Sequence, residues 1–167
     1  MEYVAWASLN YELRKLATPN NIPTDVPVIV VGQDTGETIT ISNNYAEVMA
    51  GSGNDTITAG SGINEVYGFG GNDNISTGAG DDIINGGSGN DTYTIRGDVV
   101  AIIYEAPDHG NNDSLYLSSN YYYYGYAASI DNKHLFAIYD DQAVFVIDAW
   151  ENKGIENIYL GNLAFSS

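Results

Sequence analysis

Large apolar residues recur every nine positions through the middle of the chain. The units Ala50–Thr58, Ala59–Tyr67, Gly68–Ser76, Thr77–Asn85 and Gly86–Thr94 each begin with a glycine-rich polar stretch. The eighth position of each unit is apolar and is occupied by Ile57, Val66, Ile75, Ile84 and Tyr93. A short apolar–polar alternation after a tight turn is typical of a half-buried strand. The pattern predicts a stack of short strands in which two units complete one circuit of a thin, two-sheet coil.

The chain before the repeats has a different pattern. Residues 2–17 place Trp6, Leu9, Leu13 and Leu16 at spacings that fall on one face of an amphipathic helix. Three prolines, Pro19, Pro23 and Pro27, then predict an extended connector. Short strands are expected at Val28–Val31 and Thr38–Ile41, with a turn at Gly32–Gly36 between them. We expect the helix to be a cap, a docking element or the end of an upstream domain.

The chain after the repeats is rich in residues that favour strands. Strands are predicted at Val99–Tyr104, Leu115–Leu117, Leu135–Tyr139, Ala143–Ala149 and Ile155–Leu160. These patterns divide the chain into residues 1–44 as a helix and connector or cap, 45–103 as the repeat coil, and 104–167 as a β-rich capping flank.

The acidic composition limits the classes of partner that the chain is expected to bind. Five Lys and Arg residues stand against 22 Asp and Glu residues, giving a net charge of −17. Nucleic acid is excluded as an expected partner, because binding a phosphate backbone requires basic residues. No stretch approaches the ~20 apolar residues of a transmembrane helix. Cysteine is absent, so no disulfide can stabilise the fold, and a bound metal is a candidate substitute.

The spacing of the acids suggests where such a metal would bind. Asp55, Asp73 and Asp91 are 18 residues apart, so two-unit circuits would place them along one edge of the coil. Asn64 and Asp82 would lie along the other edge. Calcium prefers six to eight hard oxygen ligands, which carboxylates of stacked turns and glycine-loop carbonyls can provide. The spacing therefore predicts calcium sites between stacked turns, with the three-aspartate edge the better of the two.

The nine-residue unit resembles the calcium-binding repeat of RTX (repeats-in-toxin) proteins, G-G-x-G-x-D-x-U-x, where U is a large apolar residue. The flank resembles this family too: Val144–Trp150 and Gly154–Leu160 are similar to the segment that caps the roll in haemolysins and the adenylate cyclase toxin. The resemblance implies an all-β fold, a parallel β-roll (a two-sheet right-handed solenoid) with an N-terminal helix and a C-terminal capping flank. It also implies about three calcium ions or more. Two would lie on the first edge, with Asp73 serving both, and one weaker site would lie on the second edge, because Asn64 is neutral where the family has Asp. The glycines expected in the calcium-binding turns are Gly51, Gly53, Gly60, Gly62, Gly68, Gly70, Gly71, Gly78, Gly80, Gly86, Gly87 and Gly89.

The family resemblance also implies a function. RTX modules belong to extracellular proteins that leave Gram-negative bacteria through type I secretion machinery, with a signal near the C-terminus. We therefore expect a secreted, non-catalytic module that folds on calcium binding and assists the secretion, folding and stabilisation of a larger protein. Two alternatives stay open: a calcium-rigidified ligand-binding domain of an adhesin, and the C-terminal part of a secreted protease, lipase or epimerase.

Several residues outside the repeats complete these expectations. The second edge is expected to stop after Asp82, because Asp98 is off register and Val100 occupies the next aspartate position. Glu105 and Asp113 are candidates for an additional calcium site in the flank. The remaining candidates are given structural interpretations: surface or capping roles for His109 and His134, and a strand packed over the end of the roll, rather than a ligand platform, for Tyr121–Tyr124 with Tyr126.

Overall fold

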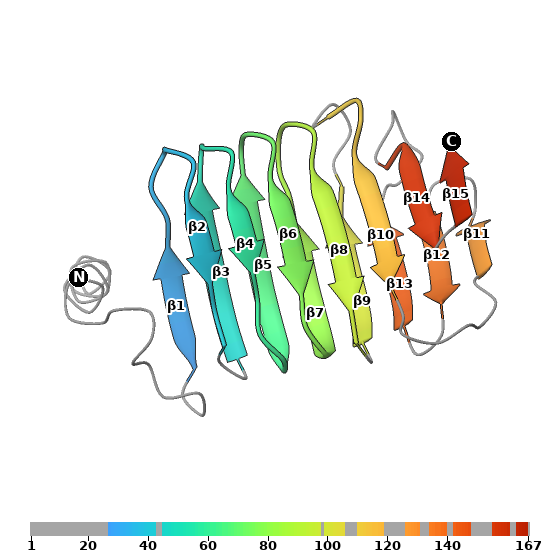
Figure 1. Ribbon diagram of the computed structural model, residues 1–167, viewed down its shortest axis with the longest axis horizontal. Helices are drawn as coiled ribbons and strands as arrows, with labels where there is room; N and C mark the ends of the chain where they lie inside the picture. Colours follow the sequence, from blue (N-terminus) through green and yellow to red (C-terminus); the bar gives the residue numbers. More distant parts are fainter. Residues whose placement is uncertain are drawn as a thin grey trace.

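The computed structural model describes residues 27–42, 45–97, 99–105, 110–118, 126–130, 134–139, 142–147, 155–160 and 163–166. The described part contains 15 β-strands and no helix, and it forms two facing sheets (Figure 1). The predicted all-β, two-sheet parallel solenoid is therefore confirmed. The helix predicted at residues 2–17 lies outside the described residues, as do Asp98, His109 and Tyr121–Tyr124. No helix in the described part is long and apolar enough to cross a membrane.

The strands alternate between the two sheets. The 8-stranded sheet, here sheet A, has the order β1-β3-β5-β7-β9-β13-β12-β11. Its strands are β1 (Val28–Val31), β3 (Tyr45–Gly51), β5 (Ile63–Phe69), β7 (Gly80–Asn85), β9 (Val99–Tyr104), β11 (Tyr126–Ile130), β12 (His134–Tyr139) and β13 (Gln142–Ile147). The 7-stranded sheet, here sheet B, has the order β15-β14-β10-β8-β6-β4-β2. Its strands are β2 (Thr38–Thr40), β4 (Thr56–Thr58), β6 (Asn74–Thr77), β8 (Thr92–Arg96), β10 (Ser114–Ser118), β14 (Asn157–Leu160) and β15 (Leu163–Ser166).

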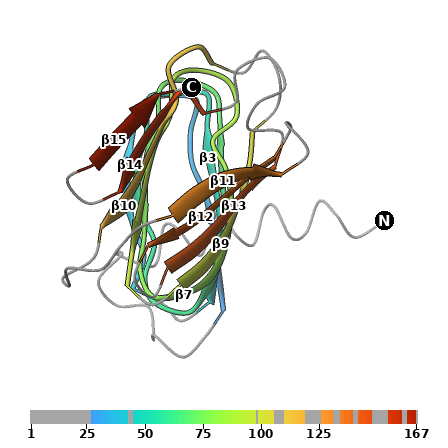
Figure 2. The ribbon, with the colours of Figure 1, turned by 90° about the vertical axis from the view of Figure 1, so that its right-hand side faces the viewer.

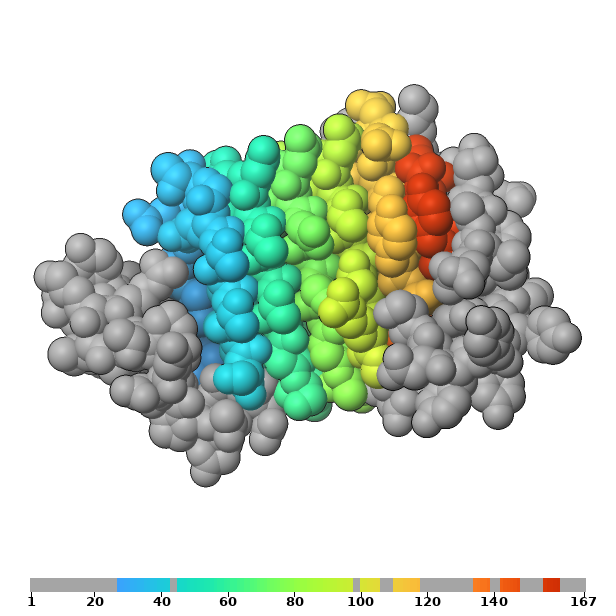
Figure 3. Space-filling view, in the orientation of Figure 1, coloured from blue at the N-terminus to red at the C-terminus, as the bar shows by residue number. Residues whose placement is uncertain are grey.

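The register of the parallel strands follows the repeat. Val48 pairs with Val66 in sheet A, and Ile57 pairs with Ile75 in sheet B, so each residue lies beside the one 18 positions later. Two nine-residue units therefore complete one circuit, as the sequence predicts. Figure 3 shows these circuits as successive bands that follow the chain from blue to red.

The core is one layer of side chains between the two sheets. Figure 2 shows the two facing sheets end-on. Sheet B contributes a buried column formed by Ile39, Ile57, Ile75, Tyr93, Leu115 and Ile158. Sheet A contributes the facing column of Val48, Val66, Ile84, Ile103, Val146 and Leu135. All the eighth-position residues of the repeats are buried in this layer, because alternate strand residues point to the same side.

The turns are tight enough to demand glycine at particular positions. Gly51 has a φ of 124°, and a Cβ there would collide with the carbonyl oxygen of Gln33 in the preceding circuit. Phe69 occupies the equivalent position one circuit later, paired with Gly51, and has a φ of 73°. A bulky side chain in this left-handed region is strained. Phe69 is therefore a local exception to the repeat.

The coil continues after the repeats end and is then closed by antiparallel strands. β13 pairs in parallel with β9, and β14 pairs in parallel with β10, although both come from the flank. β12 and β11 then extend sheet A in antiparallel fashion, and β15 does the same for sheet B. Each of the five strands predicted in the flank region has a counterpart at nearly the same residues. Circuits thus also form from chain that lacks the nine-residue pattern.

The outer faces of the two sheets differ in chemistry. The outward residues of the central strands of sheet B are mainly Thr, Ser and Asn, as in the Thr38–Thr40 and Thr56–Thr58 strands. Nine exposed large apolar side chains lie instead on strands of sheet A: Ile29, Val31, Tyr45, Ile63, Phe69, Val100, Tyr104, Ile138 and Phe145. The outer face of sheet A is therefore rich in apolar side chains, although Glu47, Glu65 and Asp81 also lie on it, whereas the outer face of sheet B is mainly polar apart from Tyr116 on β10.

Candidate metal centre

A ladder of aspartates runs along one edge of the coil. We call this edge, where turns lead from sheet A to sheet B, the acidic edge. The backbone N–H of Asp55 donates to Oδ1 of Asp73 at 2.8 Å, and that of Asp73 donates to Oδ1 of Asp91 at 2.8 Å. The N–H of Asp91 continues the ladder to Oδ1 of Asp113 at 2.6 Å. The three aspartates predicted to share an edge are thus brought together, and Asp113 of the flank joins them.

Each aspartate of this ladder uses only one of its carboxylate oxygens. Asp55, Asp73, Asp91 and Asp113 are 1–2% exposed. Their Oδ2 atoms are buried and have no hydrogen-bond partner. A buried carboxylate oxygen without a partner is costly, because it has lost its hydration and gained nothing in return. A row of such atoms needs a compensating group between the turns.

Among the described residues, no basic side chain provides that compensation. Arg96 is the only Lys or Arg in the described part of the chain, and it is exposed at the end of β8 in sheet B. Burial raises the pKa of Asp73 to about 7, and the neighbouring charges of Asp91 and Asp55 add to this rise against the lowering effect of the Asp55 N–H. Burial also raises the pKa of Asp91 to about 6. Without a cation, burial therefore moves the titration of these carboxylates from the acidic range toward neutral pH.

A second ladder, formed by asparagines, runs beside the aspartates. The N–H of Asn72 donates to Oδ1 of Asn54 at 2.7 Å, and that of Asn90 donates to Oδ1 of Asn72 at 2.7 Å. The N–H of Asn111 continues the row to Oδ1 of Asn90 at 3.0 Å. These bonds run toward the preceding circuit, whereas the aspartate bonds run toward the following one. The neutral ladder fixes the turns without creating charge.

The opposite edge, where turns lead from sheet B back to sheet A, carries a single pair. The N–H of Asn64 donates to Oδ1 of Asp82 at 3.1 Å, and its side-chain amide donates to the same oxygen at 2.9 Å. Burial raises the pKa of Asp82, and the hydrogen bond from Asn64 opposes that rise. Asp82 Oδ2 and Asn64 Oδ1 are buried without a partner. The predicted second edge is present, and its carboxylate is partly satisfied by an amide.

This edge ends after Asp82, but the predicted register was wrong by one residue. Asp82 pairs with Ala101, whereas Val100 pairs with Asp81. The reason is that one extra residue lengthens the circuit between β7 and β9 from 18 to 19 residues. Ala101 is buried and has no side-chain oxygen, so the edge gains no further ligand.

The predicted glycines divide between the two edges. Those in the turns between β3 and β4, β5 and β6, and β7 and β8, or at the strand ends beside them, lie on the acidic edge: Gly51, Gly53, Gly68, Gly70, Gly71, Gly86, Gly87 and Gly89. Gly60, Gly62, Gly78 and Gly80 lie on the opposite edge. Gly68 and Gly86 are positioned so that a Cβ would collide with Oδ2 of Asp73 and Asp91, respectively. The carboxylates therefore occupy space that only glycine leaves open.

Two residues of the acidic edge were missed by the sequence reasoning. Glu37 precedes the first strand of sheet B as Asp55 precedes the second, and its N–H donates to Oδ1 of Asp55 at 2.7 Å. At the other end, Glu156 accepts the N–H of Asp113 at 2.6 Å through Oε2. The repeated sequence Thr-Ile-Thr at 38–40 and 56–58 could have revealed Glu37. Glu156 lies 43 residues after Asp113, so no repeat spacing marks it.

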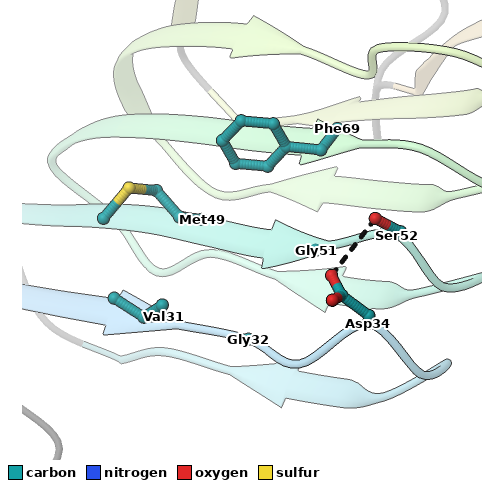
Figure 4. Close-up of a pocket in the computed structure, with 7 residues that line it drawn as sticks. All are labelled: Val31, Gly32, Asp34, Met49, Gly51, Ser52 and Phe69. Carbon is teal, nitrogen blue, oxygen red and sulfur yellow. Dashed lines mark hydrogen bonds between the residues drawn. The ribbon is translucent and has the colours of Figure 1, made fainter.

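A shallow hollow lies beside the acidic edge on the outer side of sheet A (Figure 4). Val31, Met49 and Phe69 form its apolar wall. Asp34 is its only carboxylate and accepts a hydrogen bond from the Ser52 hydroxyl at 3.1 Å. The hollow differs from the buried aspartate ladder, because its carboxylate, Asp34, is exposed and is paired with the Ser52 hydroxyl.

Comparison with known families identifies the repeats. The family model for RTX calcium-binding nonapeptide repeats matches residues 49–83 and 67–94, and it represents four copies of the repeat. Residues 49–94 are RTX calcium-binding repeats. No curated protein matches the sequence at a significant level. The matched segment covers the turns of Asp55, Asp73 and Asp91, and the RTX coil is therefore a calcium-binding β-roll.

The residues of the RTX turns fit calcium chemically. Calcium takes six to eight oxygen ligands and accepts both carboxylates and backbone carbonyls. In the described part, no three acidic, histidine or cysteine side chains gather around one point. The acids instead form a row, one per turn, so each ion would be completed by turn carbonyls. Asp55, Asp73 and Asp91 would hold ions on the acidic edge, and Asn64 with Asp82 would hold one on the opposite edge.

Proposed function

We propose that this module folds when calcium binds and that it serves the secretion, folding and stabilisation of a larger extracellular bacterial protein. The observation that supports this proposal is the row of buried Oδ2 atoms on Asp55, Asp73, Asp91 and Asp113, which have no hydrogen-bond partner in the described part of the chain. Like charges stacked at low dielectric oppose folding unless a cation separates them. The module itself is proposed to be non-catalytic.

The secretion role follows from the calcium dependence. An ion that binds only the folded state stabilises it by RT ln(1 + [Ca²⁺]/Kd). Calcium is scarce in the cytosol, so the chain would stay extended enough to enter a type I secretion channel. Extracellular modules bind calcium with Kd values of about 10⁻⁴–10⁻³ M, which suits the higher concentration outside the cell. Folding would then begin outside and hinder backward movement.

Circular dichroism of the full chain tests the folding step. We expect the β signal to be largely absent in chelator and to appear on adding calcium, with a midpoint of about 10⁻⁴–10⁻³ M. Magnesium should not replace calcium, because it demands a smaller octahedral site and keeps its water ligands. A full β signal in chelator, unchanged by calcium, would contradict the proposal.

Export can be tested separately. A passenger protein carrying this module and a type I secretion signal should accumulate in the medium in folded form when calcium is supplied. The variant Asp73→Asn should reduce that accumulation, whereas Asp81→Asn, which removes an exposed charge from β7, should not. Equal export of both variants would argue against a role for the calcium sites in secretion.

One observation favours a second function, that of a calcium-rigidified binding domain of an adhesin. Sheet A has an apolar outer face, and contiguous exposed apolar surfaces commonly mark interaction sites. Phe145 and Phe136 pack together on this face with ring centroids 4.5 Å apart. A glycan-array and cell-binding screen in calcium and in chelator tests this alternative. Calcium-dependent binding that Phe145→Ser abolishes would support it, and the absence of any binding would oppose it.

A further inference from the structure

The acidic edge does not stop where the RTX repeats stop. Ser114 pairs with Thr92, so Asp113 takes the register position of Asp91 in the next circuit. Ser114 also pairs with Asn157, which places Glu156 one circuit further along. The matched repeats end at residue 94. Two further acids therefore extend the row beyond the repeats, one of them from the strand pair that closes the coil.

The two ends of the ladder differ in how their last acid is satisfied. At the N-terminal end, both carboxylate oxygens of Glu37 accept hydrogen bonds from Gln33: Oε2 from the backbone N–H at 2.8 Å and Oε1 from the side-chain amide at 2.9 Å. At the C-terminal end, Glu156 Oε1 is buried without a partner, and so is Asp113 Oδ2. Of the two acids that end the ladder, Glu37 has both carboxylate oxygens paired, whereas Glu156 leaves one oxygen that a cation could bind.

A third acid lies close to this end of the row. Tyr104 pairs with Asn85, so the next residue, Glu105, takes the register position of Gly86. Its side chain enters the interior, is 3% exposed and accepts a hydrogen bond from the Tyr93 hydroxyl. Burial raises the pKa of Glu105 to about 9, and the charges of Asp113, Asp91 and Glu156 contribute to this rise. The last turns thus concentrate buried acids, with no basic side chain among the described residues beside them.

We propose that Asp113 and Glu156 hold an additional calcium ion beyond the RTX repeats, with Glu105 beside it, and that this ion couples closure of the C-terminal circuit to calcium binding. Asp113 is 1% exposed, and its free oxygen faces the interior of the turn beside Gly110. Glu156 immediately precedes β14, whose docking on β10 completes the last parallel circuit. The ion therefore joins segments that are 43 residues apart in the chain. This inference rests on the proposed calcium-dependent folding.

The test combines ion counting with local hydrogen exchange on the full chain. Asp113→Asn and Glu156→Gln keep the size of each side chain and an acceptor oxygen but remove the charge. Each should bind one calcium ion fewer than the wild type in native mass spectrometry. Each should also need about tenfold more calcium to protect the amides of β14, because the ion loses a charged ligand; a tenfold change corresponds to about 1.4 kcal/mol. Glu47→Gln on the outer side of sheet A is the control and should behave like the wild type.

Hydrogen exchange of the β6 amides distinguishes the flank-site hypothesis from the proposed calcium-dependent folding. In both flank variants, calcium should still protect β6, which lies within the RTX repeats. If both variants bound as many ions as the wild type and protected β14 at the same calcium concentration, the flank site would be refuted while calcium-dependent folding stood. If the wild type bound no calcium and β6 exchange were unaffected, the proposed function itself would fail.

Discussion

The two edges of the coil share one backbone geometry but solve the problem of buried acids in different ways. On the acidic edge, each carboxylate faces another carboxylate one circuit away, and one oxygen of each aspartate has no partner. On the opposite edge, Asp82 also has one oxygen without a partner, but its other oxygen accepts a hydrogen bond from the side-chain amide of Asn64 at 2.9 Å. Replacing one carboxylate oxygen by an amide nitrogen thus supplies a donor and removes a negative charge. The comparison teaches that the side chain at one repeat position sets how strongly an edge depends on a cation.

The edges also differ in length. The acidic ladder runs from Glu37 through four aspartates to Glu156, whereas the opposite edge has one pair that Ala101 terminates. Repulsion between neighbouring carboxylates accumulates along a row, so the acidic edge should dominate the response to calcium. Four changes test that difference, ordered by the size of the expected effect.

The largest effect is expected from Asp73→Asn. Asp73 has an aspartate on both sides and is predicted to serve two ions, and asparagine retains the oxygen that accepts the Asp55 N–H. The calcium midpoint of folding should rise by tenfold or more, because the substitution removes a charged ligand. A tenfold rise corresponds to about 1.4 kcal/mol of binding free energy. Calcium titration followed by circular dichroism measures this shift. Asp82→Asn on the opposite edge should have a smaller effect; an equal or larger one would reverse the ranking of the edges.

The next largest effect is a dependence on pH. The pKa of Asp73 is raised to about 7 and those of Asp91 and Asp113 to about 6, mainly by burial, above the value of about 4 for an unfolded chain. Between about pH 4 and 7 the cation-free folded state therefore binds more protons than the unfolded state, so its stability falls as the pH rises through this window.

Circular dichroism in chelator at pH 5 and pH 8 measures the pH effect, and the chain should retain more β signal at pH 5 than at pH 8. Calcium and protons compete for the same oxygens, so calcium affinity should fall as the pH is lowered below 7. Calcium affinity that is unchanged between pH 7 and pH 5 would contradict the assignment of these carboxylates as ligands.

A smaller effect is expected from Asn64→Asp, which converts the opposite edge into a copy of the acidic one. The change removes the amide donor to Asp82 and adds a charge beside it. The chain should become less stable in chelator, and its calcium affinity should rise a few-fold. Each change should amount to about 1 kcal/mol. Isothermal calorimetry measures the calcium affinity, and the β signal that remains in chelator reports the stability of the cation-free chain. A rise in stability in chelator would show that the amide is not what stabilises this edge.

The smallest effect should come from Phe69→Gly, which alters the acidic edge without touching a carboxylate. Phe69 has a positive φ where Gly51 and Gly87 occupy the equivalent positions. Relief of left-handed strain should stabilise the chain by about 1 kcal/mol in calcium. The number of ions bound, measured by native mass spectrometry, should not change. A lost ion would mean that Phe69 shapes a calcium site rather than only the turn.

The regular part of this protein could be predicted from the sequence because its contacts repeat the local pattern. A nine-residue unit with one inward apolar residue fixes the 18-residue circuit, and that circuit assigns Asp55, Asp73 and Asp91 to one edge and Asn64 with Asp82 to the other. Most strands of the flank followed from their β-forming residues, but β15 was not predicted, and neither were the partners of the flank strands. These features depend on spacing, which is a property of the chain alone.

Tertiary structure decided what spacing does not encode. One inserted residue moved Ala101, rather than Val100, beside Asp82. Glu156 reached the acidic ladder only because β14 packs in parallel on β10, which joins segments separated by a long excursion through β11, β12 and β13. The sequence by itself determined the repeating turns and their acids. The folded coil decided which distant acids extend that row and which oxygens remain without a partner, because both depend on contacts between circuits.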